Sequence, residues 1–295
     1  MSSDAAVMSG SSARARDFVA LAKPRLNLLV VASTLVGYAM ADGEALGIVR
    51  VAGLLLGTGL VAGGASAFNQ VMERDLDALM KRTRTRPMPD QRLQPVEGLL
   101  AAGAMTLAGL VLIVASSNVL AAAVALATLL SYVVVYTPLK RRSSFGTVIG
   151  AIPGALPPII GWAAAENALP AQAWTLFGIM FLWQLPHFLA IAWMYREDYA
   201  RAGFPMLPVL EPDGRSTGRQ AVVYAAALVP LSLAPTLMGM AGVPYFAGAL
   251  VLGIAFLGLT VRFAFTRDNR DARRAFFGSI IYLPLLWILM IANKL

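Results

Sequence analysis

Long apolar stretches, separated by short charged or Pro/Gly-rich segments, run through almost the whole chain. A helix needs roughly 20 largely apolar residues to cross a bilayer. Nine stretches approach this length, the first of them short, at about residues 26–41, 48–68, 98–115, 119–137, 145–164, 172–194, 221–241, 243–265 and 274–293. Because backbone polar groups cannot stay unpaired in lipid, runs of this length are expected to be helical. The pattern predicts an all-α integral membrane protein with nine transmembrane helices.

Basic residues fall on alternate connecting segments. Of the 24 Lys and Arg residues, 22 lie in the arm through residue 25 and in segments 69–97, 138–144, 195–220 and 262–274. Only Arg50 and Lys294 fall on the other side. The positive-inside rule places the five basic segments and the N-terminus in the cytoplasm. The net charge of +8 therefore indicates orientation, and binding of nucleic acid is not expected.

The composition agrees with a bundle of membrane-spanning helices and excludes several kinds of active site. Charged residues make up 14% of the chain, against about a quarter in soluble domains. The absence of cysteine and the single histidine exclude disulfides, thiolate metal sites and multi-histidine sites. We expect residues 1–17 to form a disordered N-terminal tail and residues 18–295 a single transmembrane domain. The tail does not resemble a signal peptide, and its acidic residues argue against a mitochondrial transit peptide. The absence of a transit signal favours a bacterial inner (plasma) membrane over a mitochondrial one.

The segment after the second apolar stretch carries the first candidate site. Asn69, Glu73 and Asp77 are spaced i, i+4, i+8 and would share one face of a helix, whereas Asp75 would lie off that face. Proteins usually bind Mg²⁺ through one or two carboxylates together with phosphate oxygens of the substrate. Arginine binds phosphate oxygens with two hydrogen bonds. Cations follow at once, at Lys81, Arg82, Arg84 and Arg86. The pattern favours a Mg²⁺–diphosphate site over a charged loop that only contacts lipid headgroups.

A second acidic segment follows the sixth apolar stretch on the same side of the membrane. It contains Glu197 and Asp198, of which Asp198 is the better metal-ligand candidate. Lys140 and Arg141 add cations on this side, either for diphosphate or only as topological anchors. His187 lies inside an apolar stretch. It is equally well explained as a packed core residue or as a functional group.

Five segments carry a resemblance to a known family. They are Asn69 with Asp75-x-Asp77, Arg82-Thr83 and Arg86-Pro87; Tyr136-Thr137-Pro138-Leu139-Lys140-Arg141; Gly150-x-x-Pro153-Gly154-Ala155-x-Pro157-Pro158; Trp183-Gln184-x-Pro186-His187-Phe188; and Asp198-Tyr199-x-x-Ala202-Gly203-x-Pro205-Met206-Leu207-Pro208. Over about residues 18–290 the chain resembles the UbiA-type intramembrane prenyltransferase superfamily, and within it the protohaem IX farnesyltransferases. The resemblance implies nine transmembrane helices with cytoplasmic acidic loops after helices 2 and 6. Two positions depart from the pattern: Glu73 stands where this branch commonly has Asp, and Ala202 where the superfamily's second motif has another acid.

The resemblance implies a Mg²⁺-dependent prenyltransferase acting on farnesyl diphosphate and haem B. Farnesyl would be transferred to a haem vinyl group with addition of water, giving haem O. The implied metal ligands are Asn69, Glu73, Asp77 and Asp198. The implied catalytic residues are Asp75, Asp77, Lys81 and Arg82. The implied substrate-binding residues are Asn69, Arg86, Lys140, Arg141, His187 and Tyr199, with His187 expected to contact haem, axial ligation being one form of that contact.

Three other interpretations account for part of the pattern. One is a prenyltransferase of the same fold acting on an aromatic quinone precursor, against which the Trp183–Phe188 motif argues. A polytopic transporter would use the acids and His187 as ion or proton sites, but transporter sites usually lie near the bilayer midplane. A structural assembly factor would not need clustered acids. Besides its two substrates, the expected partners are membrane lipid and, for the product, haem A synthase or terminal-oxidase assembly proteins.

Overall fold

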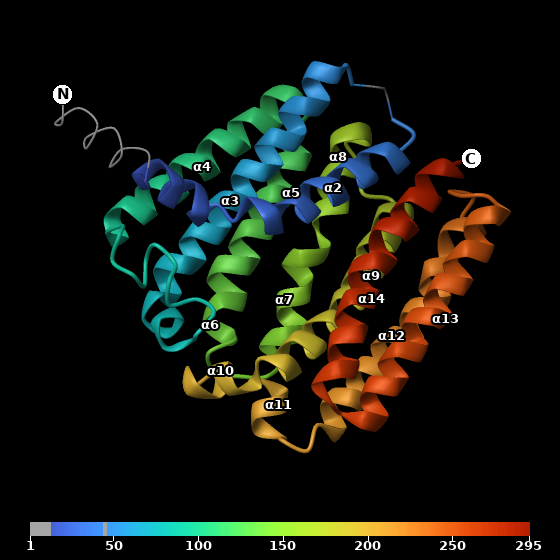
Figure 1. The fold of residues 1–295 in the computed structure, drawn as a ribbon. Helices are drawn as coiled ribbons and strands as arrows, with labels where there is room; N and C mark the ends of the chain where they lie inside the picture. The colour runs from blue at the N-terminus through green and yellow to red at the C-terminus, as the bar shows by residue number, and fades with distance from the viewer. Residues whose placement is uncertain (1–12, 44–45) are drawn as a thin grey trace, which may run out of the picture.

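The computed structural model describes residues 13–43 and 46–295, and this part of the chain is helical without any strand (Figure 1). A helix over Ala13–Leu21 comes first. The elements that follow are α2 (Pro24–Met40), α3 (Ile48–Leu79), α4 (Pro95–Ser116), α5 (Val119–Leu130), the π-helix η1 (Ser131–Tyr136), α6 (Thr137–Leu139), α7 (Gly146–Ala155), α8 (Pro157–Glu166), α9 (Ala171–Met194), α10 (Arg196–Arg201), α11 (Leu207–Leu210), α12 (Arg215–Leu237), α13 (Val243–Thr266) and α14 (Asn269–Ala292).

The membrane-spanning character that the apolar pattern predicted is confirmed. Eight helical segments in the described residues are long and apolar enough to cross a bilayer. A ninth span results if the bent pair Ala13–Leu21 and Pro24–Met40 is counted as one. The bend between the two is 45°. It lies at Lys23, which has a left-handed backbone (φ 45°) and precedes a proline, so the helix cannot run straight through this point.

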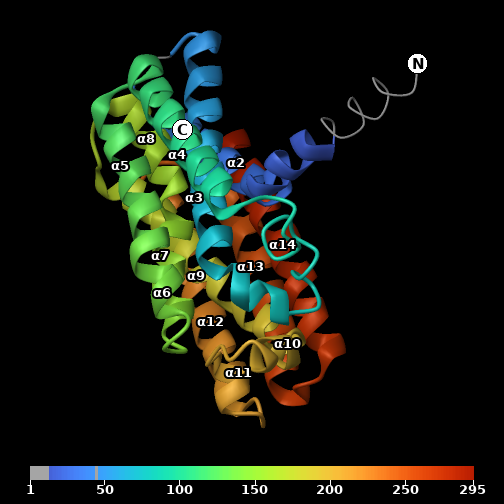
Figure 2. The ribbon, with the colours of Figure 1, turned by 90° about the vertical axis from the view of Figure 1, so that its left-hand side faces the viewer.

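Three connections rich in basic residues gather at one end of the bundle, here called the basic end. Residues 80–94, 140–145 and 195–214 connect helices there. In Figures 1 and 2 this end is marked by α10 and α11, and the C-terminus lies toward the opposite end in Figure 1. Neighbouring helices pack in pairs, α3 on α4, α12 on α13 and α2 on α8, and α9 contacts both α12 and α14.

Two segments outside the predicted apolar spans are helical. The second span was expected to end at residue 68, but α3 continues to Leu79, so the first acidic segment occupies its last turns. No glycine or proline interrupts residues 65–79, and nothing in this stretch stops a helix. Residues 13–17, expected in the tail, belong to the helix Ala13–Leu21, in which Asp17 pairs with Arg92 and Leu21 is fully buried. The rest of the expected tail, residues 1–12, lies outside the described residues.

Two spans are interrupted midway. The span after α5 continues through η1, a stretch of π-helix, before α6. The next span divides at Leu156 into α7 and α8, because Pro157 and Pro158 begin the second piece. π-Helical turns are rare and are frequently found at functional sites. Both interruptions border the cavity described below.

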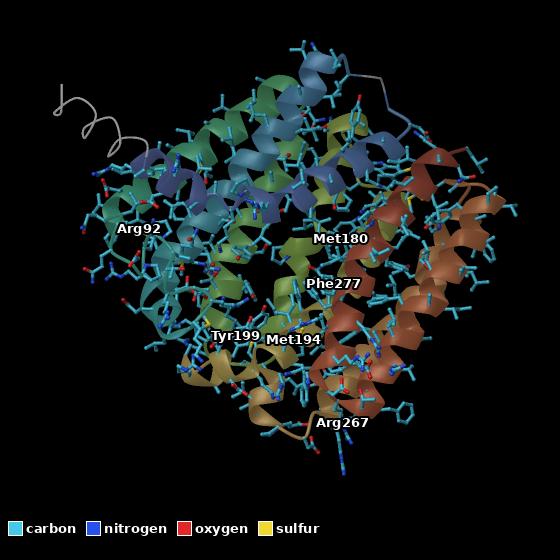
Figure 3. The ribbon with its side chains drawn as sticks, in the orientation of Figure 1. Arg92, Met180, Met194, Tyr199, Arg267 and Phe277 are labelled. Atoms are coloured by element: carbon cyan, nitrogen blue, oxygen red, sulfur yellow. The ribbon has the colours of Figure 1, made fainter. Side chains whose placement is uncertain are left out.

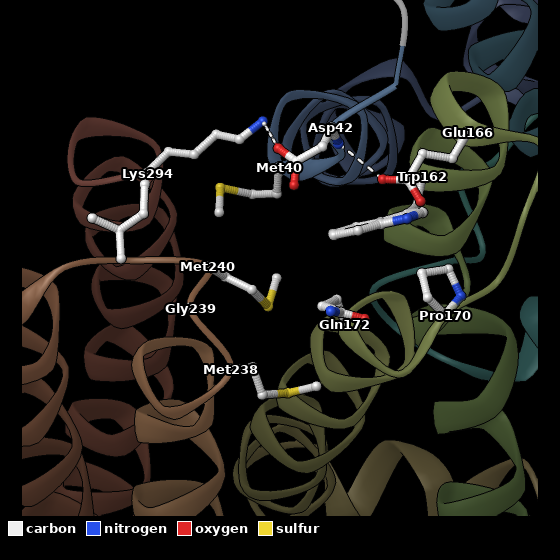
Figure 4. Close-up of a pocket in the computed structure, with 11 residues that line it drawn as sticks. Met40, Asp42, Trp162, Glu166, Pro170, Gln172, Met238, Gly239, Met240 and Lys294 are labelled. Atoms are coloured by element: carbon white, nitrogen blue, oxygen red, sulfur yellow. Dashed lines mark hydrogen bonds and ion pairs between the residues drawn. The ribbon is translucent and has the colours of Figure 1, made fainter.

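The end of the bundle opposite the basic end is closed by the C-terminus (Figure 4). Lys294 Nζ donates to the carbonyls of Ala39 (3.0 Å) and Ala41 (2.7 Å) at the end of α2, and pairs with Asp42 at 3.1 Å. The Asp42 N–H donates to the Glu166 carboxylate at 2.8 Å. A pocket of about 340 Å³ lies beneath, lined by Met40, Trp162, Pro170, Gln172, Met238, Met240 and Leu295. This pocket has a single cation, so it lacks the cluster of positive charge that a diphosphate needs.

Candidate active site

The last turns of α3 present the face that the i, i+4, i+8 spacing predicted. Asn69, Glu73 and Asp77 are 3%, 2% and 1% exposed. Asp75 points the other way: its side chain is 87% exposed and pairs with Arg74 at 3.3 Å. Helical periodicity therefore separates Asp75 from the other acids, and the structure does not place it beside them.

Each buried carboxylate on this face is paired with a cation from another segment. Lys140 Nζ donates to Glu73 Oε2 at 2.7 Å, and Arg86 Nη1 donates to Asp77 Oδ2 at 2.7 Å. Burial by itself would lower the pKa of Lys140, but the Glu73 carboxylate more than offsets this and holds that pKa above its ordinary value. Glu73 Oε1 is buried without a hydrogen-bond partner in the described structure. The face therefore keeps one acceptor oxygen for a further cation.

Asn69 connects the acidic face to the interrupted span. Its Nδ2 donates to Thr137 Oγ1 at 3.2 Å, and Thr137 Oγ1 in turn donates to the Tyr132 carbonyl at 2.9 Å. Thr137 is 1% exposed and follows directly on η1. The π-helical turn thus positions both Lys140 and the rings of Tyr132 and Tyr136 beside α3.

The second acidic segment packs directly on the first, as expected for two loops that face each other. Arg82 Nη2 donates to the Tyr199 hydroxyl at 2.8 Å. The same guanidinium lies 5.1 Å from the Tyr195 ring and 5.2 Å from the Tyr199 ring, within the range of cation–π attraction. Met80 packs with Ala202 and Phe204 in a small apolar cluster. Ala202, which replaces an acid of the superfamily pattern, is 4% exposed in this cluster and has an apolar packing role.

The other residues predicted for this site lie apart from the acidic face. Asp198 pairs with Arg201 at 2.7 Å, and within residues 13–43 and 46–295 no three acids or histidines lie close enough together to hold a metal ion. The metal set expected from Glu73, Asp77 and Asp198 is therefore not assembled around one point. Lys81 and Arg141 are exposed and form no ion pair with any described residue.

A largely apolar cavity of about 290 Å³ opens next to the acidic face. Tyr132 and Tyr136 line it from η1, and Phe188 lines it from α9. Lys23 also lines it and lies between the helix Ala13–Leu21 and α2. Its other lining residues are Leu26, Asn27, Val30, Thr58, Val61, Ala62, Ala65, Ser66, Ala125, Thr128, Leu129, Gly150, Pro153, Gly154, Pro157 and Ile160. An apolar chain could lie here with its charged head among the cations, and we call this space the donor cavity.

His187 lies deeper in the bundle, in an aromatic stack. Its ring is stacked with Trp183 (5.3 Å between centroids) and Phe276 (4.9 Å), and meets Phe188 edge-on at 5.7 Å. Nδ1 lies 2.7 Å from Ser279 Oγ, whose hydroxyl is also 2.6 Å from the Phe276 carbonyl. His187 is thus held in one orientation beside the donor cavity, separate from the acidic face.

Comparison with known proteins agrees with this geometry. The family model described as "UbiA prenyltransferase family" matches residues 30–283. The chain belongs to the UbiA prenyltransferase family. As a family member it is an enzyme of the membrane, with many membrane-length helices. The resemblance that the sequence motifs indicated is therefore confirmed.

Curated relatives of this UbiA family member match it over nearly their whole length. One named "Protoheme IX farnesyltransferase" from Solibacter usitatus is 46% identical over 288 residues, covering 95% of this chain and 99% of the relative. Another with the same name, from Opitutus terrae, is 42% identical and covers 97% of each chain.

Solved structures show the same fold at low sequence identity. A digeranylgeranylglyceryl phosphate synthase structure aligns with a TM-score of 0.79 at 16% identity, covering 95% of this chain and 98% of the other. A UbiA homolog from Archaeoglobus fulgidus bound to GPP and Mg²⁺ aligns with a TM-score of 0.67 at 17% identity, covering 93% and 99%.

Several residues at the site could not be selected from the sequence. Lys23 was counted only as part of a basic arm, although it lines the donor cavity. Ser279, which holds His187, lies 92 positions away in an unremarked part of the last span. Tyr195 begins the basic segment 195–220 and carries no signal of its own, yet its ring lies 5.1 Å from the Arg82 guanidinium. The one signal available was the Lys23-Pro24 pair, which marks a break at the start of an apolar stretch.

Proposed function

We propose that this enzyme transfers the farnesyl group of farnesyl diphosphate to a vinyl group of haem B, giving haem O. The named relatives support this assignment, because they are 42–46% identical and are covered almost completely. The observation that carries it is the buried face of Asn69, Glu73 and Asp77, which meets cations from two other segments at the mouth of an apolar cavity. A prenyl diphosphate has the same division into an apolar chain and a charged head.

The acidic face fits a magnesium ion. Its donors are carboxylate and amide oxygens, which Mg²⁺ prefers, and Glu73 Oε1 is a buried acceptor without a partner among the described residues. Asn69, Glu73 and Asp77 would hold the metal, and Asp198 would join them from the facing segment after leaving its pair with Arg201. When bound, Mg²⁺ neutralises charge on the diphosphate. The homolog of the same fold bound to GPP and Mg²⁺ is consistent with this role.

The protein's own cations would stabilise the leaving group. As the bond between the farnesyl C1 carbon and the bridging oxygen breaks, the diphosphate takes the electron pair. Lys140, Arg86 and Arg82, which lie at the acidic face and its facing segment, would stabilise the charge that grows on it. Fixed charges aimed at developing charge usually provide the largest part of catalysis. Asp75 and Lys81, which are exposed, would act by holding neighbouring arginines and the entering diphosphate at the rim.

The allylic cation that remains would be shielded by the aromatic residues of the donor cavity. Tyr132 and Tyr136 line this cavity on the side that leads to Lys140, and cations are attracted to such ring faces. The terminal carbon of the haem vinyl group then forms the new carbon–carbon bond. Water adds to the adjacent carbon and loses a proton, which completes the hydroxyethylfarnesyl group. Tyr199 and Arg141 would help to bind the diphosphate, and His187 the haem.

Orientation and location follow from the charge pattern. The basic segments lie at one end of the bundle together with the acidic face, and the positive-inside rule places this end, with the N-terminus, in the cytoplasm. We assign the enzyme to a bacterial inner membrane. Farnesyl diphosphate would therefore be taken up at the cytoplasmic surface, while its chain and the porphyrin reach the site through lipid.

The reaction can be tested with purified protein in nanodiscs. The protein is incubated with haem B, farnesyl diphosphate and Mg²⁺, and haem O is sought by mass spectrometry, with Asp77→Asn and a chelated sample in parallel. We expect haem O from the parent and a loss of product in both parallel samples. Prenylation of an aromatic acid in place of haem B would exclude the haem assignment and leave the family assignment intact.

A further inference from the structure

A second pocket at the basic end lies between the end of α9 and the start of α14. It has a volume of about 330 Å³ and is lined by Met194, Tyr195, Asn269, Arg273, Phe276 and Phe277. Met194 and Phe277 are labelled in Figure 3, on the two helices that form the pocket. Phe277 is 54% exposed on an outer surface of a membrane bundle, so the pocket is accessible from lipid.

Two contacts link this pocket to the machinery of the proposed reaction. The Phe276 ring is stacked on His187 at 4.9 Å, and His187 meets Phe188, which lines the donor cavity. The Tyr195 ring lies 5.1 Å from the Arg82 guanidinium, which reaches across to the second acidic segment. A chain of ring contacts, from Phe276 through His187 to Phe188, therefore connects the pocket with the donor cavity.

The rim of this pocket carries a positive charge that could bind an anionic group. Arg273 lines the pocket, is exposed, and forms no ion pair with any residue in the described ranges. Two arginines near it are already engaged, because Arg274 and Arg262 both pair with Asp271. An unpaired guanidinium at a membrane boundary suits a carboxylate, which it can bind with two hydrogen bonds.

We infer that this pocket binds the propionate edge of the porphyrin acceptor, with Arg273 holding a carboxylate and the ring extending past Phe276 toward His187. The inference rests on the proposed function, because it takes haem B as the acceptor. Haem has two carboxylates along one edge and apolar vinyl groups away from them. A site with a cation at the aqueous rim and aromatic residues further in complements that distribution, and it directs a vinyl edge toward the donor cavity.

Haem binding without turnover provides the first test. Iron protoporphyrin IX is titrated into the protein in nanodiscs, without farnesyl diphosphate or Mg²⁺, and followed by its Soret absorbance. Arg273→Gln is expected to raise the Kd by about tenfold, the size of a charge-assisted hydrogen bond. Arg270→Gln is the matched control, because Arg270 is exposed on the same helix but does not line the pocket. An unchanged Kd for Arg273→Gln would overturn the inference.

The dimethyl ester of iron protoporphyrin IX shows whether the lost interaction is with a propionate. The parent should bind the ester about tenfold more weakly than the free acid, and Arg273→Gln should bind both equally. If Arg273→Gln still prefers the free acid by the same factor as the parent, Arg273 is not the carboxylate's partner and the inference fails.

Kinetics separate failure of this inference from failure of the proposed function. Arg273→Gln should raise KM for haem and leave KM for farnesyl diphosphate unchanged. If the parent makes haem O but neither haem constant changes in Arg273→Gln, the pocket assignment is wrong and the function stands. If Arg273-dependent haem binding is found but no haem O is formed by the parent, the pocket assignment stands and the proposed reaction is wrong.

Discussion

Glu73 and Lys140 lie 67 positions apart in the sequence, yet their charged atoms are 2.7 Å apart in the structure. One Glu73 oxygen accepts the hydrogen bond from Lys140, and the other is buried without a partner in the described part of the chain. Lys140 also lies 5.5 Å from the Tyr136 ring centre, at the edge of the donor cavity. A single pair thus joins the acidic face, the interrupted span and the cavity. The positions of all three depend on how α3 packs against η1.

Replacing Lys140 by methionine should impair both folding stability and activity. The change leaves the Glu73 carboxylate buried without its cation, and breaking such a pair typically costs about 3 kcal/mol or more. We expect a lower thermal midpoint in nanodiscs and a loss of farnesyl transfer of roughly a hundredfold, the usual effect of removing one charge-stabilising donor. Both are measured on the same preparation, the second as kcat.

Two companion variants make this prediction specific. Lys140→Arg keeps the charge and should recover most of the thermal midpoint. Arg142→Met removes a neighbouring exposed cation that contacts no acid among the described residues, and it should leave the midpoint and kcat close to those of the parent. A Lys140→Met protein as stable and active as Arg142→Met would show that the pair has no role.

Asp77 and Asp75 offer a second comparison within one turn of α3. Asp77 is 1% exposed and bound by Arg86, whereas the Asp75 side chain is 87% exposed. Asp77→Asn should lower kcat/KM for farnesyl diphosphate by roughly a hundredfold. Asp75→Asn should have a clearly smaller effect, since its carboxylate contacts only an exposed arginine and is screened by water. Equal losses in the two variants would contradict the orientation of the helix described here.

Much of the architecture was predictable from local pattern. Apolar run length indicated the spans, and the i, i+4, i+8 spacing indicated that Asn69, Glu73 and Asp77 share a face, because both depend on periodicities within one helix. The same periodicity argued against Asp75, which was included only on resemblance. The end of α3 was misplaced because charged residues at a membrane boundary stop a hydropathy run without stopping a helix.

The long-range pairings could not be predicted. Arg82 meets Tyr199 across 117 positions and His187 meets Ser279 across 92, and such contacts are determined by helix packing. No spacing rule relates residues on different helices. The π-helix η1 could not be predicted either, because its sequence is rich in β-branched residues and has the pattern of an ordinary apolar span. The sequence indicated that Arg86 and Lys140 belong to the site, but not which acid each of them pairs with.

Gly150 offers a test of how η1 shapes the donor cavity. A Cβ at this position would lie 2.4 Å from the Tyr136 ring, which is closer than atoms can approach. Gly150→Ala should therefore displace Tyr136 and lower kcat, with a reduced thermal midpoint. Gly103→Ala is the matched control, because a Cβ there meets no atom within 4 Å, and it should stabilise helix α4 by up to about 1 kcal/mol. Both midpoints are measured by thermal unfolding in nanodiscs, and a harmless Gly150→Ala would contradict the packing of Tyr136.

The contacts of His187 predict which of its ring nitrogens has a lone pair free to bind a metal. Ser279 has one hydroxyl proton, and its Oγ lies 2.6 Å from the Phe276 carbonyl, which can only accept. The hydroxyl must therefore accept from His187 Nδ1–H at 2.7 Å, which leaves the lone pair on Nε2. A histidine that binds iron usually donates its other N–H in this way. We expect Nε2 to ligate the haem iron.

The chain has a single histidine, so the spectrum of bound haem gives a direct answer once any affinity tag is removed. Ferric haem added to the parent should show the Soret and visible bands of an imidazole-ligated iron, and His187→Ala should lose them. Ser279→Ala should keep the ligand but bind haem about tenfold more weakly, because the ring loses its orienting partner. Identical spectra for the parent and His187→Ala would show that His187 does not ligate iron, and would leave it with the packing role that its stacked neighbours already define.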